Sequence, residues 1–259
     1  MKTMIFAAGL GTHLKPLTDT VPKALVPVAG EPLLRHVISR LQQYGLDDFV
    51  INVHHFSEKI ISYISDCRSF GSKVAVSDES ACLLDTGGGI LKAKDLLLDG
   101  EPEDGRFLVH NVDILSDLDV NGFIAACRRG VLATLLVSGR KTQRYLLFDD
   151  DMRLVGWTNV ATGEVRSPYP SLDVAACRKF AFSGIHLISN GVFDVMESEG
   201  MGERFPIMDF YLKICDRYPV YGYVQDPLNL IDVGKLDTLA QAEDFILRLR
   251  RNSPEGFEA

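Results

Sequence analysis

A glycine- and proline-rich loop near the N-terminus carries the residue types best suited to chemistry. Residues 4–27 read MIFAAGLGTHLKPLTDTVPKALVP, an apolar run followed by Gly9, Gly11, two prolines and Lys23. Glycine has no Cβ, so backbone N–H groups here can approach an anion closely, and the prolines stiffen the loop. Lys23 would add a positioned positive charge. This order predicts a phosphate-handling loop, although it matches neither G-x-x-x-x-G-K-[ST] nor G-x-G-x-x-G.

Two carboxylates end other apolar runs of the chain. Asp113 closes RFLVHNVD, and Asp232 closes NLID. Ligands of open α/β sheets bind outside the carboxyl ends of the strands, so we expect both side chains near the glycine loop. Mg²⁺ is usually held by one or two carboxylates together with substrate phosphates. Helix capping is the better interpretation of either aspartate alone, whereas the pair favours a metal site.

Alternating hydrophobic patterns predict the elements that position these residues. The expected strands cover 4–8, 49–53, 73–76, 106–113 and 131–137, and the expected helices cover 33–41, 57–64, 89–98 and 120–129. Such alternation is typical of parallel strands with helices on both faces. The fold class is therefore predicted to be α/β, with a doubly wound, mostly parallel, Rossmann-like sheet.

The pattern changes after residue 138. A hairpin is expected over 145–164, a strand over 180–188, a helix from Pro206, a strand over 220–224 and a last helix from Lys235. This style is α+β. We expect one domain over residues 1–252, made of a half at 1–138 and a half at 139–252 that includes the last helix, with a frayed tail at 253–259.

The composition limits the partners. The 259 residues are 46% hydrophobic and carry a formal net charge of −8, which argues against nucleic acids and anionic membrane surfaces. Five scattered cysteines lack C-x-x-C spacing, so neither a disulfide framework nor a zinc site is expected. Because no leader pattern and no long apolar run occur, we expect a cytoplasmic protein, as a monomer or small homo-oligomer.

Five motifs, in one order, resemble those of the sugar-1-phosphate nucleotidyltransferases, also called NDP-sugar pyrophosphorylases. They are A-A-G-x-G-T-x-x-x-P-L-T-x-x-x-P-K-x-L-x-P at 7–27, LLDTGGGI at 83–90, HNVDI at 110–114, FSGIHLI at 182–188 and LIDVGKLDTLAQAE at 230–243. Together they span nearly the whole chain. The DTGGG and DVG-x-L forms are most similar to the group of N-acetylmuramate-1-phosphate uridylyltransferases and mannose-1-phosphate guanylyltransferases.

The resemblance implies a Mg²⁺-dependent reaction between a nucleoside triphosphate and a sugar-1-phosphate, giving an NDP-sugar and pyrophosphate. By motif match, Asp113 and Asp232 would hold Mg²⁺, and Lys23 would neutralise charge at the phosphates. The second half of the chain would bind the sugar. The implied contacts are Ala8, Gly9, Gly11, Thr12, Glu79 and Gly88 for the nucleotide, and Ser183 and Gly184 for the sugar.

Two residues depart from the family pattern near the phosphates. His13 stands where the family has arginine, which predicts a weakened phosphate clamp or, alternatively, a surface histidine without a part in catalysis. Val112 stands where the family commonly has glycine. A positive φ at that position would strain a β-branched residue, whereas an ordinary φ would only narrow the site.

The sugar side departs further, because GWTNVATGE replaces the E-K-P segment of larger relatives. A basic cluster of Arg140, Lys141 and Arg144 follows the strand at 131–137, and it fits a sugar-phosphate clamp and a solvated loop equally well. Two other functions stay open. One is a degenerate, non-catalytic nucleotide- or sugar-nucleotide-binding homologue, and the other is transfer to a non-sugar phosphate such as phosphocholine.

Overall fold

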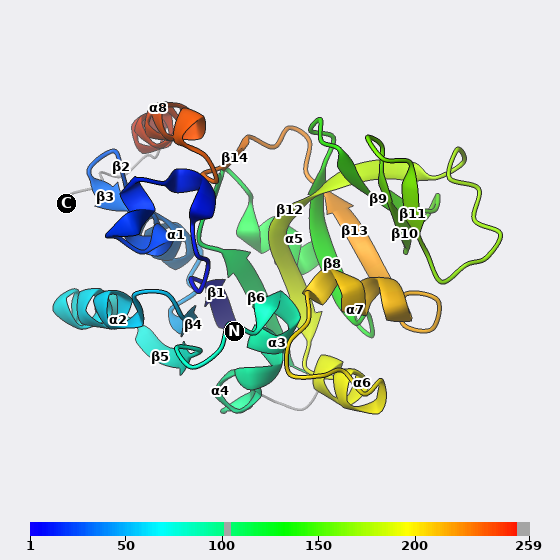
Figure 1. Ribbon diagram of the computed structural model, residues 1–259, viewed down its shortest axis with the longest axis horizontal. Helices are drawn as coiled ribbons and strands as arrows, with labels where there is room; N and C mark the ends of the chain where they lie inside the picture. The colour runs from blue at the N-terminus through cyan, green and yellow to red at the C-terminus, as the bar shows by residue number, and fades with distance from the viewer. Residues whose placement is uncertain (101–104, 253–259) are drawn as a thin grey trace.

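The computed structural model describes residues 1–100 and 105–252, so the tail predicted at 253–259 lies outside the described residues. Four parallel strands form one side of its central sheet (Figure 1). In spatial order they are β5 (Lys73–Asp78), β4 (Asp48–Val53), β1 (Lys2–Phe6) and β6 (Arg106–Asn111). The doubly wound, mostly parallel sheet expected from the alternating pattern is confirmed.

The long strand β12 (Arg178–Ser189) joins the two halves of the chain. It pairs antiparallel with β6 on one side and with β8 (Ala133–Ser138) on the other, and β13 (Val220–Val224) continues parallel to β8. The N-terminal part of β12 also pairs with β9 (Arg144–Phe148), which leads to β10 (Leu154–Asn159) and β11 (Glu164–Arg166). The predicted hairpin is therefore present, and one antiparallel strand separates β8 from the four parallel strands.

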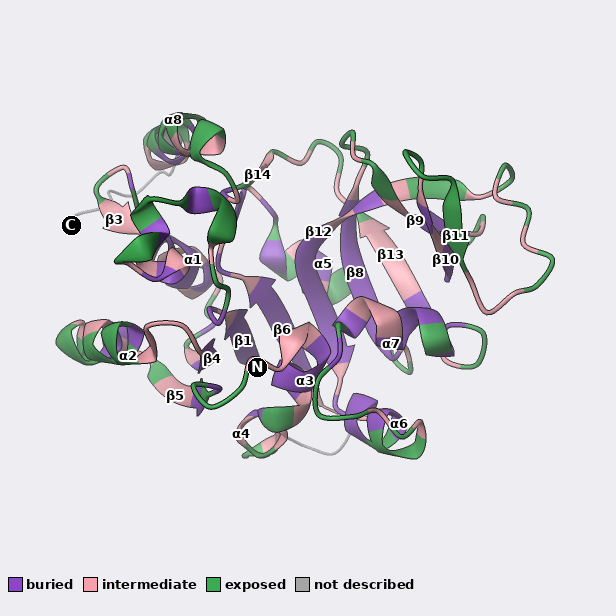
Figure 2. Ribbon diagram, in the orientation of Figure 1, coloured by how far each residue is buried: buried purple, intermediate pink, exposed green. Residues whose placement is uncertain are grey.

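Two apolar cores cover the two faces of this sheet. Alternate residues of β1 point to opposite faces, so Ile5 lies in one core and Met4 in the other. The first core contains residues of α1 (Leu33–Gln42), α2 (Ser57–Asp66), α5 (Val120–Ala126) and α8 (Leu236–Asn252). The second contains residues of α3 (Asp85–Lys92), α4 (Lys94–Leu98), α6 (Val192–Ser198) and α7 (Ile207–Ile214). Figure 2 shows the central strands β1, β6 and β8 as largely buried.

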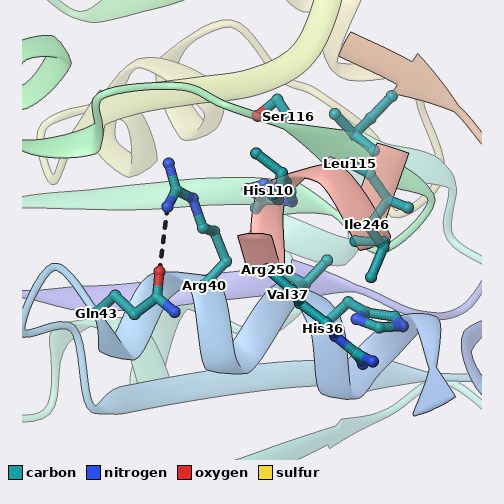
Figure 3. A pocket seen from close by; sticks show the side chains of 11 residues that line it. His36, Val37, Arg40, Gln43, His110, Leu115, Ser116, Ile246 and Arg250 are labelled. Carbon is teal, nitrogen blue, oxygen red and sulfur yellow. Dashed lines mark hydrogen bonds between the residues drawn. The ribbon is translucent and has the colours of Figure 1, made fainter. Parts of the chain in front are cut away.

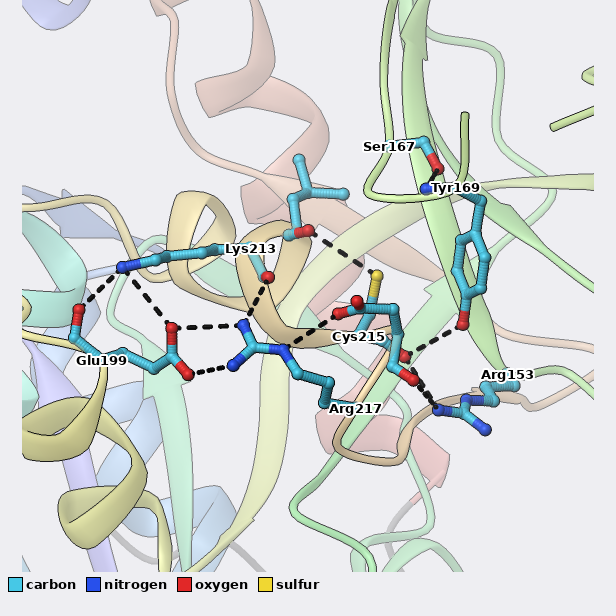
Figure 4. Close-up of polar contacts among 9 residues, drawn as sticks. Arg153, Ser167, Tyr169, Glu199, Lys213, Cys215 and Arg217 are labelled. Carbon is cyan, nitrogen blue, oxygen red and sulfur yellow. Dashed lines mark hydrogen bonds and ion pairs between the residues drawn. The ribbon is translucent and has the colours of Figure 1, made fainter. Parts of the chain in front are cut away.

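The hairpin strands are tied to α7 by polar contacts at the end of that helix (Figure 4). Arg153 Nη2 donates to the carbonyls of Cys215 and Asp216 at 3.0 and 3.2 Å, and the Tyr169 hydroxyl donates to the Cys215 carbonyl at 3.3 Å. The last carbonyls of a helix have no partner within it, so these contacts stabilise the helix end and fix the position of the hairpin.

Helix α8 returns the end of the chain to the first half. The short strand β14 (Leu230–Asp232) pairs antiparallel with β7 (Ile114–Ser116), and α8 follows it. A small cavity of about 40 Å³ remains between α1, β7 and α8, with His36, His110 and Ile246 in its wall (Figure 3). Burial lowers the pKa of His110 to about 4, so this histidine is neutral at pH 7.

Several predicted boundaries were wrong. The helix expected from Gly89 begins at Asp85, so the three glycines lie inside α3, and Thr86 accepts a hydrogen bond from Ile207 N–H instead of capping the helix. Helix α5 ends at Ala126 rather than Arg129. The short elements α6, β7 and the ribbon of β2 (Pro27–Val28) and β3 (Glu31–Pro32) were missed, because few residues carry their periodicity. Within the described ranges, no helix has the length and apolar character needed to cross a bilayer.

Candidate active site

A cleft of about 380 Å³ opens where β1, β4, β5 and β6 end. Parallel strands bring their carboxyl ends to one edge of a sheet, so residues far apart in sequence meet there. Its walls are formed by Phe6, Ala8, Gly9, Lys23, Asn52, Glu79, Leu83, Asp85, Thr86, Asn111, Val112, Asp113 and Pro206. The structure thus brings together Ala8, Gly9, Lys23, Glu79 and Asp113, as the sequence predicts.

The glycine loop forms the cleft wall nearest β1 and folds into three short 3₁₀ turns, at Thr12–Leu14, Leu17–Asp19 and Lys23–Leu25. Gly11 has φ of +65°, and a Cβ there would lie 2.7 Å from Thr18 Cγ2. Its carbonyl accepts from Thr18 Oγ1 at 2.7 Å, and Leu14 is fully buried. Only glycine fits this turn. Thr12 and the exposed His13 lie on the turn that Gly11 starts.

Lys23 and Asp113 form an ion pair across the cleft. Lys23 Nζ donates to Asp113 Oδ2, and the two side chains are only 14% and 19% exposed. They come from the glycine loop and from the residue pair after β6, 90 positions apart. The predicted positive charge therefore lies directly beside the first predicted carboxylate.

Asp232 completes a pair of neighbouring carboxylates. Its strand β14 pairs with β7 so that Asp232 stands opposite Ile114, and Val233 N–H donates to the Asp113 carbonyl at 2.8 Å. Burial and then the negative charge of Asp113 raise the pKa of Asp232, while Lys23, Arg140 and Lys235 act in the opposite direction. No group of three or more metal-ligating side chains occurs in the described part of the chain.

The pair fits a hard cation by the nature of its donors. Mg²⁺ takes oxygen ligands and is usually bound through one or two carboxylates, with substrate phosphates and water completing its shell. Two adjacent carboxylates repel one another, which a divalent cation would offset. The positions of Asp113 and Asp232 therefore suit the metal role that the sequence predicts for them.

Glu79 lies in the cleft wall but is 1% exposed. Its Oε1 accepts from Asn52 Nδ2 at 2.7 Å, and its Oε2 accepts from Leu84 N–H at 3.2 Å. Each carboxylate oxygen keeps a further lone pair, so a nucleotide contact by Glu79 stays open.

The DTGGG motif packs mainly against the segment before α7. The N–H groups of Gly87 and Gly88 both donate to the Phe205 carbonyl, and a Cβ at Gly88 would lie 2.1 Å from the Glu203 carbonyl oxygen. Gly88 lines a separate hollow beside Leu84 and Glu203, whereas Asp85 and Thr86 line the cleft. Asp85 and Thr86 are therefore the residues of this motif that reach the cleft. The nucleotide contact assigned to Gly88 stays a prediction.

Ser183 and Gly184 lie at an irregular point of β12, where the pairing register shifts between Phe182 and His186. Ser183 is fully buried, and its Oγ lies 3.4 Å from Ser138 Oγ. Gly184 has φ of +73°, and a Cβ there would lie 2.8 Å from Ile114 Cγ1. Glycine thus lets β12 approach the segment that carries Asp113.

The predicted basic cluster is divided. Arg140 Nη2 donates to the Phe182 carbonyl at 3.1 Å, and its charge acts on Asp232. A further hollow of about 370 Å³ is lined by Arg140, Ser138, Phe180 and the 224–230 segment. Arg144 instead begins β9, exposed and opposite Asn159 of β10. Only Arg140 is therefore placed beside the carboxylate pair.

Two residues of the cleft wall were not predicted from the sequence, and the backbone strain considered at Val112 is absent. Asn111 is the last residue of an apolar strand and Asn52 the last but one, so a polar residue near a strand end, the signal that identified Asp113, would have found both. Val112 does not adopt a positive φ, so its β-branched side chain is unstrained and 4% exposed in the first core. Asp113 therefore needs no glycine before it to hold its position.

Comparison with known proteins matches residues 2–151 to a family described as nucleotidyl transferase. A UTP–glucose-1-phosphate uridylyltransferase of Synechocystis sp. is 28% identical over 258 residues, which cover 93% of this chain and 62% of that protein. An N-acetylmuramate alpha-1-phosphate uridylyltransferase of Neisseria meningitidis serogroup B is 44% identical over 119 residues, 46% of this chain and 49% of that protein. The chain thus spans about half to two thirds of the length of these relatives.

Solved structures share the fold. A putative glucose-1-phosphate thymidylyltransferase from Bacillus anthracis superposes with a TM-score of 0.76 at 19% identity, over 99% of this chain and 97% of that chain. An inositol-1-phosphate CTP transferase from T. maritima gives a TM-score of 0.74 at 15% identity, over 98% of both chains. With a family model that matches more than half of its residues, this chain belongs to the nucleotidyl transferase family.

Proposed function

We propose that the protein is a sugar-1-phosphate nucleotidyltransferase that joins a nucleoside triphosphate and a sugar-1-phosphate into an NDP-sugar and pyrophosphate. One observation carries this proposal. Lys23 and Asp113 line a cleft beside a glycine loop, and the pairing of β14 with β7 holds Asp232 next to Asp113, in a chain of the nucleotidyl transferase family. The two relatives named uridylyltransferase support a uridine nucleotide as the donor. A mannose-1-phosphate guanylyltransferase 1 of Arabidopsis thaliana, 36% identical over 118 residues that cover 45% of this chain and 32% of that protein, supports a guanine nucleotide.

The proposed reaction is a displacement at the α-phosphorus. A phosphate oxygen of the sugar-1-phosphate forms the new bond, and the bond from the α-phosphorus to the bridging oxygen of pyrophosphate breaks. The attacking phosphate is already an anion, so the protein needs to supply positioning and charge stabilisation rather than a general base. Backbone N–H groups of Ala8 to Thr12 would hold the triphosphate, and Lys23 would offset its negative charge.

Asp113 and Asp232 would hold Mg²⁺, which, when bound, would withdraw negative charge from the phosphate oxygens. Arg140 would hold the phosphate of the sugar substrate, since it is placed next to Asp232 and beside a further hollow. Ser183, which is fully buried, and Gly184, which packs on Ile114, would support that side of the site from within β12. His13 would approach the triphosphate from the turn that follows Gly11.

The test is pyrophosphate release with Mg²⁺ from a panel of UTP, GTP, CTP, dTTP and ATP, each combined with several sugar-1-phosphates and with phosphocholine. We expect release and an NDP-sugar product from at least one uridine or guanine pair. Measurable nucleotide binding without release from any pair would instead favour the non-catalytic homologue. Product from phosphocholine alone would favour the non-sugar acceptor.

A further inference from the structure

Asn52 connects three separate parts of the nucleotide cleft. It lies in β4, is 2% exposed, and lines the cleft. Its Oδ1 accepts from Ala7 N–H at 2.8 Å, and its Nδ2 donates to Glu79 Oε1 at 2.7 Å. Glu79 in turn accepts from Leu84 N–H. One buried chain of hydrogen bonds therefore joins the start of the glycine loop, the end of β4 and the approach to α3.

The Ala7 N–H is the first donor after β1 ends. Phe6, the last residue of that strand, still takes part in the sheet, because its carbonyl accepts from Val112 N–H at 3.2 Å. Ala7 bonds to a side chain instead of a neighbouring strand. The Asn52 amide thus sets the direction in which the chain leaves β1 toward Ala8 and Gly9, whose backbone lines the cleft.

Asparagine suits this position because its amide offers an acceptor and donors on one planar group. Ala7 N–H can only donate and the Glu79 carboxylate can accept, so the orientation of the Asn52 amide follows from its two partners. An aspartate would turn an oxygen toward another carboxylate. An apolar residue would leave the Ala7 N–H unpaired, and a buried unpaired polar group is costly.

Gly89 leaves the space that this network occupies. A Cβ on Gly89 would lie 2.8 Å from Glu79 Oε1 and 3.2 Å from Asn52 Nδ2. Gly89 is inside α3, where glycine is otherwise unfavourable. The last glycine of DTGGG is therefore explained by the buried network rather than by helix formation.

We propose that Asn52 is a positioning residue of the nucleotide site, which couples the glycine loop to Glu79 without touching the reacting atoms. This inference rests on the proposed function and deepens it. Loss of the Asn52 amide should raise KM for the nucleotide roughly 10-fold, because one to two hydrogen bonds that orient the loop are lost. KM for the sugar-1-phosphate should change little, since Arg140 lies in the loop after β8 and Ser183 lies in β12.

Hydrogen exchange at the Ala7 amide tests the network without any need for activity. Asn52→Ala removes the acceptor of Ala7 N–H, and in Asn52→Asp the repulsion from Glu79 turns the new carboxylate away from its native position. In full-length protein carrying either change, Ala7 N–H should exchange at least about 10-fold faster than in the native chain. The amides of β1 before Ala7 should keep their protection. Asn121→Asp, an exposed position in α5, is the matched control for the added charge.

A polarity exchange is the sharper variant. In Asn52→Asp combined with Glu79→Gln, the new carboxylate accepts from Ala7 N–H and from the new amide, whose oxygen can accept from Leu84 N–H. We expect this pair to restore the protection of Ala7 that Asn52→Asp alone removes. Net charge equals that of the native chain, so the restoration would report the direction of the hydrogen bonds.

Unchanged Ala7 exchange in Asn52→Ala, or an exchange rate in the double variant no slower than in Asn52→Asp, would overturn the inference. Equal rises in KM for both substrates would also overturn it. A native protein that binds nucleotide but releases no pyrophosphate would refute the proposed function alone. Ala7 exchange and nucleotide affinity, measured on the same variants, would still decide the role of Asn52.

Discussion

The two halves of the molecule build their parts of the site differently. In residues 1–138 the cleft lies at the ends of parallel strands, and buried side chains such as Asn52 and Glu79 hold its walls. In residues 139–252 the corresponding surface comes from an antiparallel strand and its loops, where Arg140 is exposed. Buried hydrogen bonds fix geometry closely, whereas a loop can be replaced without disturbing the core.

The carboxylate pair stands where these halves join. Asp113 follows β6 of the first half, and Asp232 belongs to β14 of the second half, which pairs with β7. The proposed chemistry therefore depends on the contact between the halves, and the nucleotide cleft and the hollow beside Arg140 are lined by different residues. Variants on each side should separate the contributions.

The largest effect is expected at the junction. Asp113→Asn keeps the shape of the side chain but removes one charge from the pair, so Mg²⁺-dependent turnover should fall about 10³-fold. Circular dichroism and the melting temperature should stay close to those of the native protein. Asp150→Asn, on the exposed turn of the hairpin, is the control and should keep full activity. Retained turnover in Asp113→Asn would contradict the metal assignment.

Mild acid should lower the free energy of unfolding through buried histidines in both halves. Burial lowers the pKa of His110 in β6 to about 4 and that of His186 in β12 to about 3, from a usual value of 6.5. Between pH 6.5 and 5 the unfolded chain binds more protons than the folded one, so stability falls as pH falls, by up to about 1.4 kcal/mol per pH unit for each histidine.

Urea unfolding at pH 6.5 and 5.0 measures this dependence. His186 contacts the Tyr211 hydroxyl at 2.8 Å, so His186→Phe should lose stability at neutral pH and also lose about half of the pH dependence. A free energy of unfolding that is constant over this range would show that neither histidine is buried in the neutral form.

Arg140 and Arg144 provide the test on the sugar side. Arg140→Ala should raise KM for the sugar-1-phosphate about 10-fold, because a charge beside Asp232 is lost, and should leave KM for the nucleotide unchanged. Arg144→Ala should have a smaller effect, since Arg144 lies on the hairpin. Arg248→Ala, on the exposed side of α8, controls for net charge. Equal effects of Arg140→Ala and Arg144→Ala would instead mean that the two arginines act together as one basic cluster.

The smallest effect is expected on the nucleotide side. His13→Arg should preserve kcat/KM or raise it a few-fold, because arginine offers a permanent charge and more donors to phosphate oxygens than histidine does. Steady-state kinetics with varied nucleotide would measure the change. A large loss of kcat/KM in His13→Arg would mean that the loop requires histidine. An unchanged kcat/KM in His13→Ala would mean that His13 is a surface residue without a part in catalysis.

Much of the fold was predictable from local pattern. The strand at 220–224 was placed correctly, and most other strands and helices were placed within a few residues, because their apolar periods are long. The position of β12 was not predictable in the same way. Its insertion, antiparallel, between β6 and β8 depends on pairings across more than forty residues, which no local period encodes.

The sequence by itself determined the family and predicted the glycine loop, Lys23 and the two aspartates as its site, because chemistry at strand ends leaves polar residues after apolar runs. Tertiary structure alone decided which of these residues meet. It joined Asp232 to Asp113 through β7 and β14, separated Arg140 from Arg144, and revealed Asn52 between Ala7 and Glu79. These contacts depend on side-chain direction and on pairing between distant strands, and neither is written in residue types or spacing.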